Sequence, residues 1–80
     1  MNEQQIVEQG THAETLLNSD AFNKTVKNLL DQYVGIFFNT DPSENENREA
    51  AYFSARAMQE LINTLNQQVQ MKNQQLQPKE

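Results

Sequence analysis

The sequence predicts an all-α protein: a helical hairpin preceded by a short N-terminal helical arm, and oligomeric or docked in a larger assembly. Two observations predict the hairpin. Apolar residues recur at intervals of three and four along two long segments, and the break Thr40-Asp41-Pro42 separates these segments. A third observation predicts the association, because 80 residues without cysteine form only a small core and have no disulfide to stabilise it.

The N-terminal arm covers residues 1–18. Gly10 lies in the middle of this segment, where glycine lowers helix stability by about 1 kcal/mol relative to alanine. We therefore expect a weak helix that docks either on the hairpin or on a neighbouring subunit. The apolar residues of the arm have roughly helical spacing: Ile6, Val7, Ala13, Leu16 and Leu17.

The first helix of the hairpin is expected to span Asp20 to Asn39. Asn18, Ser19 and Asp20 supply side-chain oxygens for the free N–H groups of its first turn. Asp20 and Lys24 form an acid-before-base pair four residues apart, which supports a helix. One apolar stripe follows the whole segment: Phe22, Val26, Leu29, Leu30, Tyr33 and Phe37.

Near its end this helix carries more apolar surface than one partner helix can cover. Val34, Ile36 and Phe38 add to the stripe there, so we expect them to contact another protein chain. Gly35 stands between them and has two interpretations: it lets another backbone approach closely, or it is a tolerated small residue. We favour the close approach.

The segment 40–42 is expected to end this helix, because proline has no N–H and displaces the preceding residue from helical backbone angles. Two starts of the next helix remain open. The first uses Asp41 as the N-cap, with proline and then Glu44 in the first turn. The second is a capping box formed by Ser43 and Glu46.

The third segment has no glycine or proline from residue 49 to residue 77, which predicts the longest helix. Its first part completes a hairpin core of residues 19–66. Residues 67–80 form a Gln-rich extension that Pro78 ends, and this extension is either a disordered polar tail or a helix that needs a neighbour for its stability. We favour the helix, with a contact edge formed by Leu65, Val69 and Leu76.

Charge and hydropathy exclude several classes of function. A net charge of −5 and a pI of about 4.7 argue against binding to nucleic acid, which requires Lys and Arg to neutralise phosphates. No apolar run is long enough to span a membrane, and the first residues lack the basic and apolar regions of a signal peptide. We therefore expect no membrane association and a cytoplasmic location.

No residue pattern in the chain is typical of an active site or a metal centre. His12 is the only histidine, cysteine is missing, and both glycines are isolated. A zinc site needs several such ligands, and a phosphate loop needs clustered glycines. We expect no catalytic residue, no metal and no cofactor.

The candidate anion-binding residues are Arg48, Tyr52 and Arg56, which share one helix face at intervals of four. Arginine donates paired hydrogen bonds to phosphate, and tyrosine offers a stacking surface. In the alternative interpretation Tyr52 packs across the hairpin and the two arginines pair with acidic neighbours, which are Glu44, Glu49 and Glu60.

A pattern spread over roughly residues 9 to 66 is similar to one in a known group of proteins. It consists of Gly10, Ala13, Leu16-Leu17, Phe22, Asn39-Thr40, Pro42, Arg48-Glu49, Tyr52, Arg56-Ala57 and Leu61. In these residues the chain resembles a family of small helical proteins encoded by tailed bacteriophages near head and packaging genes. The resemblance implies a phage protein, although the role of many relatives is unassigned. Pro42 and Arg48-Glu49 also resemble phage anti-defence proteins that sequester cyclic nucleotides as helical oligomers.

We therefore expect a non-enzymatic phage accessory protein that acts by protein–protein interaction, as a component of the virion or of its assembly. Its partner is another copy of itself in a homo-oligomer, or another phage structural protein, in the host cytoplasm or in the virion. One alternative is an oligomeric protein that sequesters nucleotides through its arginines. Another is an inhibitor of a host enzyme.

Overall fold

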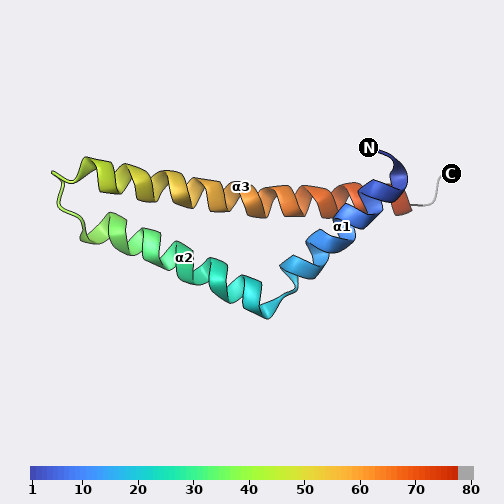
Figure 1. The fold of residues 1–80 in the computed structure, drawn as a ribbon, viewed down its shortest axis with the longest axis horizontal. Coiled ribbons are helices and arrows are strands. Elements are labelled where there is room, and N and C mark those ends of the chain that lie inside the picture. The colour runs from blue at the N-terminus through green and yellow to red at the C-terminus, as the bar shows by residue number, and fades with distance from the viewer. Residues whose placement is uncertain (78–80) are drawn as a thin grey trace.

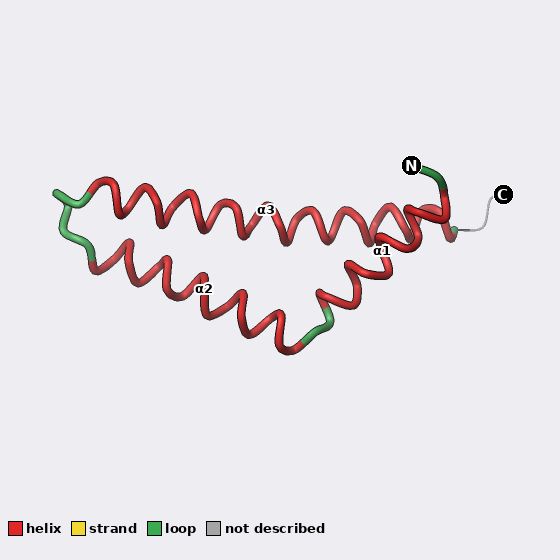
Figure 2. Tube along the Cα trace, viewed as in Figure 1, coloured by secondary structure: helices red, strands yellow, loops and turns green. Residues whose placement is uncertain are grey.

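The computed structural model describes residues 1–77 and contains three α-helices, α1 (Glu3–Leu17), α2 (Asp20–Asn39) and α3 (Asn45–Leu76). No strand occurs within these residues, so the predicted all-α class is confirmed. Two short connections, residues 18–19 and 40–44, join the helices (Figure 2).

The longest helix, α3, organises the molecule, and the other two helices share its length (Figure 1). α2 lies beside the N-terminal half of α3, and α1 crosses its C-terminal half with the more extensive contact. The molecule measures 59 × 23 × 19 Å, and its radius of gyration of 17.1 Å exceeds the value of about 12 Å expected for a compact domain of this length. Each helix of such a rod keeps much of its surface in contact with solvent.

The arm is a regular helix with a well-formed beginning. Asn2 Oδ1 accepts a hydrogen bond from the Gln5 N–H at 2.8 Å, and Gln5 Oε1 accepts one from the Asn2 N–H at 3.1 Å. These reciprocal bonds form a capping box that satisfies two N–H groups at the start of the helix. The expected docking of the arm on the rest of the chain is confirmed, since α1 packs against α3.

Gly10 allows α1 to approach α3 closely. Its φ angle is not positive, so no special backbone conformation requires a glycine here. A β-carbon at this position would instead collide with the Lys72 β-carbon and would lie 2.8 Å from the Gln68 carbonyl oxygen. Gly10 and Ala13 are both buried, and small residues at this crossing bring the two helix backbones together.

Lys72 is a charged residue on the same face of α3 as the predicted contact edge, three residues after Val69 and four before Leu76. Its aliphatic stem lies under Gly10, and its Nζ lies 2.6 Å from Glu14 Oε1. The Lys72 side chain is only 12% exposed, so the hydrocarbon is covered and the ammonium group is paired. The predicted pair of Asp20 and Lys24 is also present at 3.0 Å, but both of its side chains are largely exposed.

α2 begins as predicted, because Ser19 Oγ accepts a hydrogen bond from the Phe22 N–H at 3.2 Å. Val26 is the buried residue of this helix. The close approach of another backbone at Gly35 is not found. Within the described chain the nearest group to an added β-carbon is the Asn39 side-chain nitrogen, at 3.9 Å, so that interpretation is wrong for the single chain.

The helix ends at Asn39 as predicted, but the next helix does not begin with either expected cap. The Asp41 carbonyl accepts a hydrogen bond from the Glu44 N–H at 2.8 Å, and Asp41 Oδ1 accepts one from the Ser43 N–H. Asp41 is therefore used to form a turn before the helix. Glu44 takes the N-cap position without a side-chain hydrogen bond, so the predicted caps at Asp41 and at Ser43 are both wrong.

The Gln-rich segment is helical through Leu76, and α1 of the same chain lies beside it. The favoured interpretation, a helix with a stabilising neighbour, agrees with this arrangement, although the neighbour is the arm and not a second chain. Residues 1–18 and the part of the extension up to residue 77 thus pack together. The predicted end of the helix at Pro78 lies outside the described residues.

The buried core of the described residues is small. Its hydrophobic members are Ala13, Val26, Ala51 and Leu65, and two of these four are alanines. They are spread along the rod, with at most two on any one helix. Many larger apolar side chains consequently remain partly or largely exposed.

Candidate protein-contact surface

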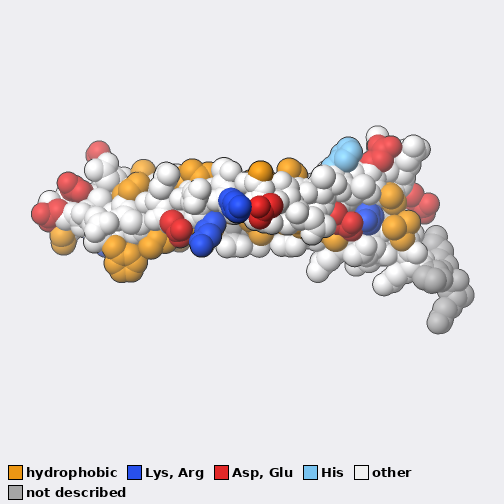
Figure 3. All heavy atoms as spheres, turned by 90° about the horizontal axis from the view of Figure 1, so that it is seen from below, with side chains coloured by type: hydrophobic (Ala, Val, Ile, Leu, Met, Phe, Trp, Pro, Cys, Tyr) orange, Lys and Arg blue, Asp and Glu red, His pale blue; other side chains and the backbone are white. Residues whose placement is uncertain are grey.

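Large hydrophobic side chains gather where α2 and α3 meet the connecting loop. The most exposed is Phe38, at 80%, followed by Phe53 at 65%. Seen from the side of α2, hydrophobic side chains are conspicuous at this end of the rod (Figure 3). We call this set the tip cluster, and its members are Val34, Ile36, Phe37, Phe38, Tyr52 and Phe53, all of them at least 41% exposed.

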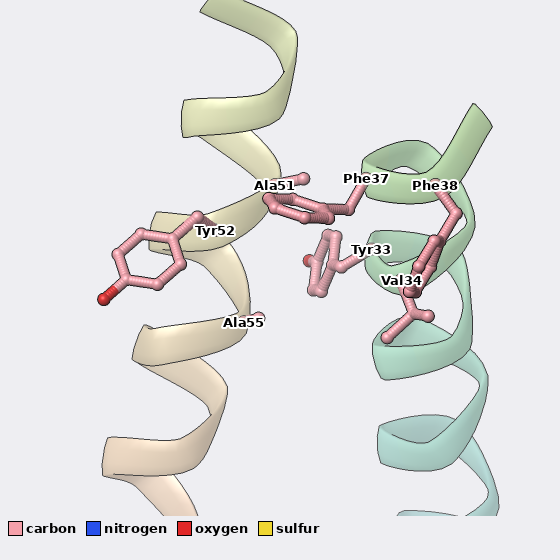
Figure 4. Close-up of a pocket in the computed structure, with 7 residues that line it drawn as sticks. All are labelled: Tyr33, Val34, Phe37, Phe38, Ala51, Tyr52 and Ala55. Atoms are coloured by element: carbon pink, nitrogen blue, oxygen red, sulfur yellow. The ribbon is translucent and has the colours of Figure 1, made fainter. Parts of the chain in front are cut away.

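A groove between α2 and α3 runs through the tip cluster and has a volume of about 240 Å³. Tyr33 and Phe37 project from α2 into the space beside α3, and Val34 and Phe38 lie next to that space on α2 (Figure 4). No charged side chain lines this groove. The lining residues are Tyr33, Val34, Phe37, Phe38, Ala51, Tyr52 and Ala55.

The α3 side of the groove is open because two of its residues are small. Ala51 and Ala55 are four residues apart, so they lie on the same face of the helix. Tyr52 stands beside them and forms an edge contact with Phe53, with 5.6 Å between ring centroids. Phe37 and Phe38 also meet edge to face, at 6.2 Å. The groove therefore has an open apolar floor with aromatic rings around it.

The structure places the predicted contact residues in two different environments. Val34, Ile36 and Phe38 are all exposed, but they lie on two sides of α2. Val34 and Phe38 line the groove described above. Ile36 lines a separate recess with Ala50 and Ser54. The three predicted residues of the second edge differ from one another. Leu76 is 61% exposed, Val69 is half-buried and Leu65 is buried.

The prediction of a contact role for Leu65 is wrong for the single chain. Its side chain is 6% exposed and lines a recess together with Ala13 and Leu16 of α1. The arm covers this part of the stripe because Gly10 and Ala13 allow α1 to lie close to α3. The spacing along α3 identified an apolar edge correctly, but the spacing alone did not show which helix would cover it.

The candidate anion-binding residues are brought together only in part. The Arg48 guanidinium carbon lies 4.5 Å from the centre of the Phe37 ring, and Arg48 and Tyr52 line a common recess. Arg56 is exposed and does not line that recess. Glu49 does line it and adds a negative charge, which opposes the binding of an anion.

The expected ion pairs of the two arginines with acidic neighbours are wrong for the described residues. The salt bridges there join Lys24 to Asp20 and Lys72 to Glu14. Arg48 instead stacks its cation on the face of Phe37, an interaction that arginine makes readily. Its Nε atom is buried and has no hydrogen-bond partner in this part of the chain.

Sequence reasoning missed two members of the tip cluster. Phe37 was assigned to the core stripe, yet it is 41% exposed because only one helix lies beside it. Phe53 was assigned to no surface at all. The available signal was that Phe53 lies outside the apolar stripe of α3, immediately after Tyr52, where a charged or polar residue is normal on an exposed helix face.

Two further classes of site have no geometric basis in residues 1–77. No helix there combines the length and the apolar character that a membrane span requires. In the same range, no three His, Cys, Asp or Glu side chains come together in an arrangement that could hold a metal ion.

No protein-family model matches this chain, and neither a curated protein nor a solved structure matches it. The resemblance to phage proteins therefore stays a prediction from the sequence. Any statement on function depends on the geometry of the surface.

Proposed function

We propose that this protein works by protein–protein interaction, with the tip cluster as its contact surface. The observation that carries the proposal is the exposure of six large apolar side chains at one end of the rod, led by Phe38 at 80% and Phe53 at 65%. Contiguous exposed apolar patches on small proteins mark interaction sites. Aromatic residues, including phenylalanine, are also enriched at protein interfaces relative to the rest of the surface.

The energetics of the chain support the same proposal. Burying a large apolar side chain contributes about 1.5–3 kcal/mol, and the tip cluster leaves this contribution largely unused in the single chain. Small domains are marginally stable even when their apolar residues are well covered. A partner that covers the tip cluster would therefore stabilise the fold and form the complex at the same time.

The biological setting that we propose is that of a tailed bacteriophage, with this protein as an accessory component of the particle or of its assembly. The support for this setting is the residue pattern of the phage family described above. The partner is then a second copy of the chain or another phage structural protein, in the host cytoplasm or in the virion. Mass spectrometry of purified particles and of assembly intermediates tests this setting, and absence of the chain from all of them would contradict it.

Photo-crosslinking tests the interaction itself. We would replace Val34 with a photoreactive phenylalanine analogue, because Val34 is exposed and lines the groove. The matched control is the same analogue at Gln32, which is exposed on the same helix and outside the groove. We expect a protein adduct at position 34 and little at position 32. Equal labelling at both positions, or no adduct with any protein, would contradict the proposal.

One observation favours a second candidate function, the sequestration of a nucleotide. Arg48 has no acidic partner within the described residues, its Nε is unsatisfied, and Tyr52 lies beside it. Calorimetric titration with cyclic dinucleotides and trinucleotides tests this candidate. Binding that is lost in Arg48→Gln and retained in Arg56→Gln would support a site at Arg48, and no heat change across the panel would exclude it.

A third candidate, inhibition of a host enzyme, is distinguished by the same crosslinking experiment. An adduct at position 34 that contains a host enzyme would favour this function. An adduct with another copy of the chain or with a phage structural protein would favour the first proposal.

A further inference from the structure

We infer that the groove of the tip cluster binds Phe38 of a second copy of this chain, so that two chains form a two-fold symmetric dimer. The inference depends on the proposed interaction function and names its partner. We identify the bound side chain as Phe38 because it fits the groove in size and chemistry and lies at the groove's edge.

The groove has the size and chemistry of a receptor for one aromatic side chain. Its volume of about 240 Å³ is below the range of roughly 300–1,000 Å³ that is typical of small-molecule pockets. Its floor includes Ala51 and Ala55, which leave room where larger residues would fill the space. No charge lines it, so an incoming phenylalanine ring would not have to displace water from an ionised group.

Phe38 is the matching projection. It belongs to the groove lining, yet its side chain is 80% exposed, so most of the ring extends away from its own chain. A two-fold interface brings the same surface patch of both chains together, so a projection and a hollow on one face can pair reciprocally. Phe38 of each chain then enters the groove of the other, and the same contact forms twice.

The surface area of the chain supports a partner of this size. The chain exposes 6268 Å², whereas a folded monomer of 9.2 kDa is expected to expose about 4,900 Å². The excess is about 1,300 Å² per chain, and a standard interface removes about 800 Å² from each partner. A dimer interface of standard size on the α2–α3 hairpin would therefore remove more than half of this excess.

The dimer would also stack two helical layers against each other. α2 and α3 form a two-helix layer at this end of the rod, and α1 lies at the other end (Figure 1). Two such layers stacked face to face give four helices around a shared apolar centre, which is a stable architecture for short helical chains. Within residues 1–77, no third helix covers the apolar face of α2 and α3 at the tip.

Complementation between two variants gives the sharpest test. Phe38→Ala removes the projection and one rim residue of the groove but keeps its floor at Ala51 and Ala55, whereas Ala55→Leu fills the floor and leaves the projection. Each variant alone loses both contacts of the symmetric dimer. An equimolar mixture restores one intact contact, because Phe38 of the Ala55→Leu chain can enter the open groove of the Phe38→Ala chain.

We would measure association by sedimentation velocity on the full chain, with Met71→Ala as the matched control. Met71 is 44% exposed and apolar, but it belongs neither to the tip cluster nor to the groove lining. We expect the wild type and Met71→Ala to dimerise alike, and each groove variant to dissociate at least about 100-fold more readily, since two buried phenylalanine contacts are lost. The mixture should dimerise more strongly than either variant alone.

Three results would overturn the dimer. The first is a wild-type chain that stays monomeric at high concentration. The second is a dimer that Met71→Ala weakens as much as Phe38→Ala does, and the third is a mixture that associates no more strongly than its components. Circular dichroism of each variant shows whether it is folded, and Phe38→Ala should be, because its side chain is mostly exposed. A monomer that still forms crosslinks from position 34 to a different protein would refute the dimer but retain the proposed interaction function.

Discussion

At the scale of single residues, the two glycines of this chain have opposite roles. A β-carbon at Gly10 would overlap Lys72 and press on the Gln68 carbonyl, whereas a β-carbon at Gly35 would meet nothing closer than 3.9 Å. Alanine favours a helix over glycine by about 1 kcal/mol at both positions. Overpacking a close contact destabilises by about 1–3 kcal/mol, and the backbone atom at Gln68 cannot move aside as a side-chain end could.

We therefore predict that Gly10→Ala lowers the free energy of unfolding by about 1 kcal/mol or more, while Gly35→Ala raises it by up to about 1 kcal/mol. Thermal unfolding followed by circular dichroism measures both variants. All samples should have the same protein concentration, because association contributes to apparent stability. Similar stabilisation by both substitutions would show that α1 is not held against α3 at Gly10.

The two ion pairs also differ at this scale. Lys72 and Glu14 have side chains that are 12% and 37% exposed, whereas Lys24 and Asp20 are 74% and 83% exposed. We predict that Glu14→Gln lowers the free energy of unfolding by about 1 kcal/mol, since it leaves a covered ammonium group without its carboxylate. Lys24→Gln should change it by no more than about 0.5 kcal/mol. Urea unfolding of the two variants makes the comparison, and equal effects would contradict it.

Some single-residue features could be predicted from the sequence, and others could not. The Ser19 cap and the Asp20–Lys24 pair were predictable because they depend on residues that are three and four positions apart. The partner of Arg48 was not, because the Phe37 ring comes from a different helix. The acidic residues near Arg48 in the sequence suggested an ion pair, and this prediction was wrong for the described residues.

At the scale of helices, α1 and the C-terminal half of α3 depend on each other. The Gln-rich half of α3 has few apolar residues, and its covered ones lie where α1 crosses. Short isolated helices are marginal in water, and most of their stability in proteins comes from packing of one face. The order of residues 67–76 should therefore depend on the docking of α1.

Ala13→Asp tests this dependence, because it would place a carboxylate at a position that is 1% exposed, near Leu65. We predict faster amide hydrogen exchange in residues 67–76, with little change in residues 51–61 beside α2. Thr11→Asp is the matched control, since Thr11 is exposed on the same helix. The same exchange rates in both variants would show that the end of α3 is ordered without α1.

The bounds of α2 followed well from the sequence, but the cap of α3 and the packing partners of the helices did not. Proline at position 42 and the cap at Ser19 mark where α2 ends and begins, because both act through local backbone chemistry. The alternative of a disordered Gln-rich tail could not be decided from composition, since the helix that covers residues 67–76 lies about sixty residues earlier in the chain. Gly10 indicated the close contact between α1 and α3, but from the sequence it was interpreted only as a residue that lowers the helix stability of the arm.

At the scale of the whole molecule, the shape explains why the tip cluster stays open. One long helix with two shorter helices placed one after the other along it gives a rod (Figure 1), and the buried hydrophobic side chains of the described residues are few. The excess apolar surface near Phe38 could be predicted from sequence, because Val34, Ile36 and Phe38 add to the stripe over a short stretch. The groove beside it could not, because Ala51 and Ala55 are unremarkable until α2 is placed opposite them.

Hydroxyl-radical footprinting of the unmodified chain, over a series of protein concentrations, tests most directly the claim that only another chain covers this surface. We predict that Phe38 is oxidised readily in dilute samples and becomes protected as concentration rises, whereas Met71, which is exposed and lies outside the tip cluster, stays reactive throughout. Phe38 that is protected even at the lowest concentration would show that its own chain covers it. Phe38 that stays reactive at every concentration would show that a second copy does not.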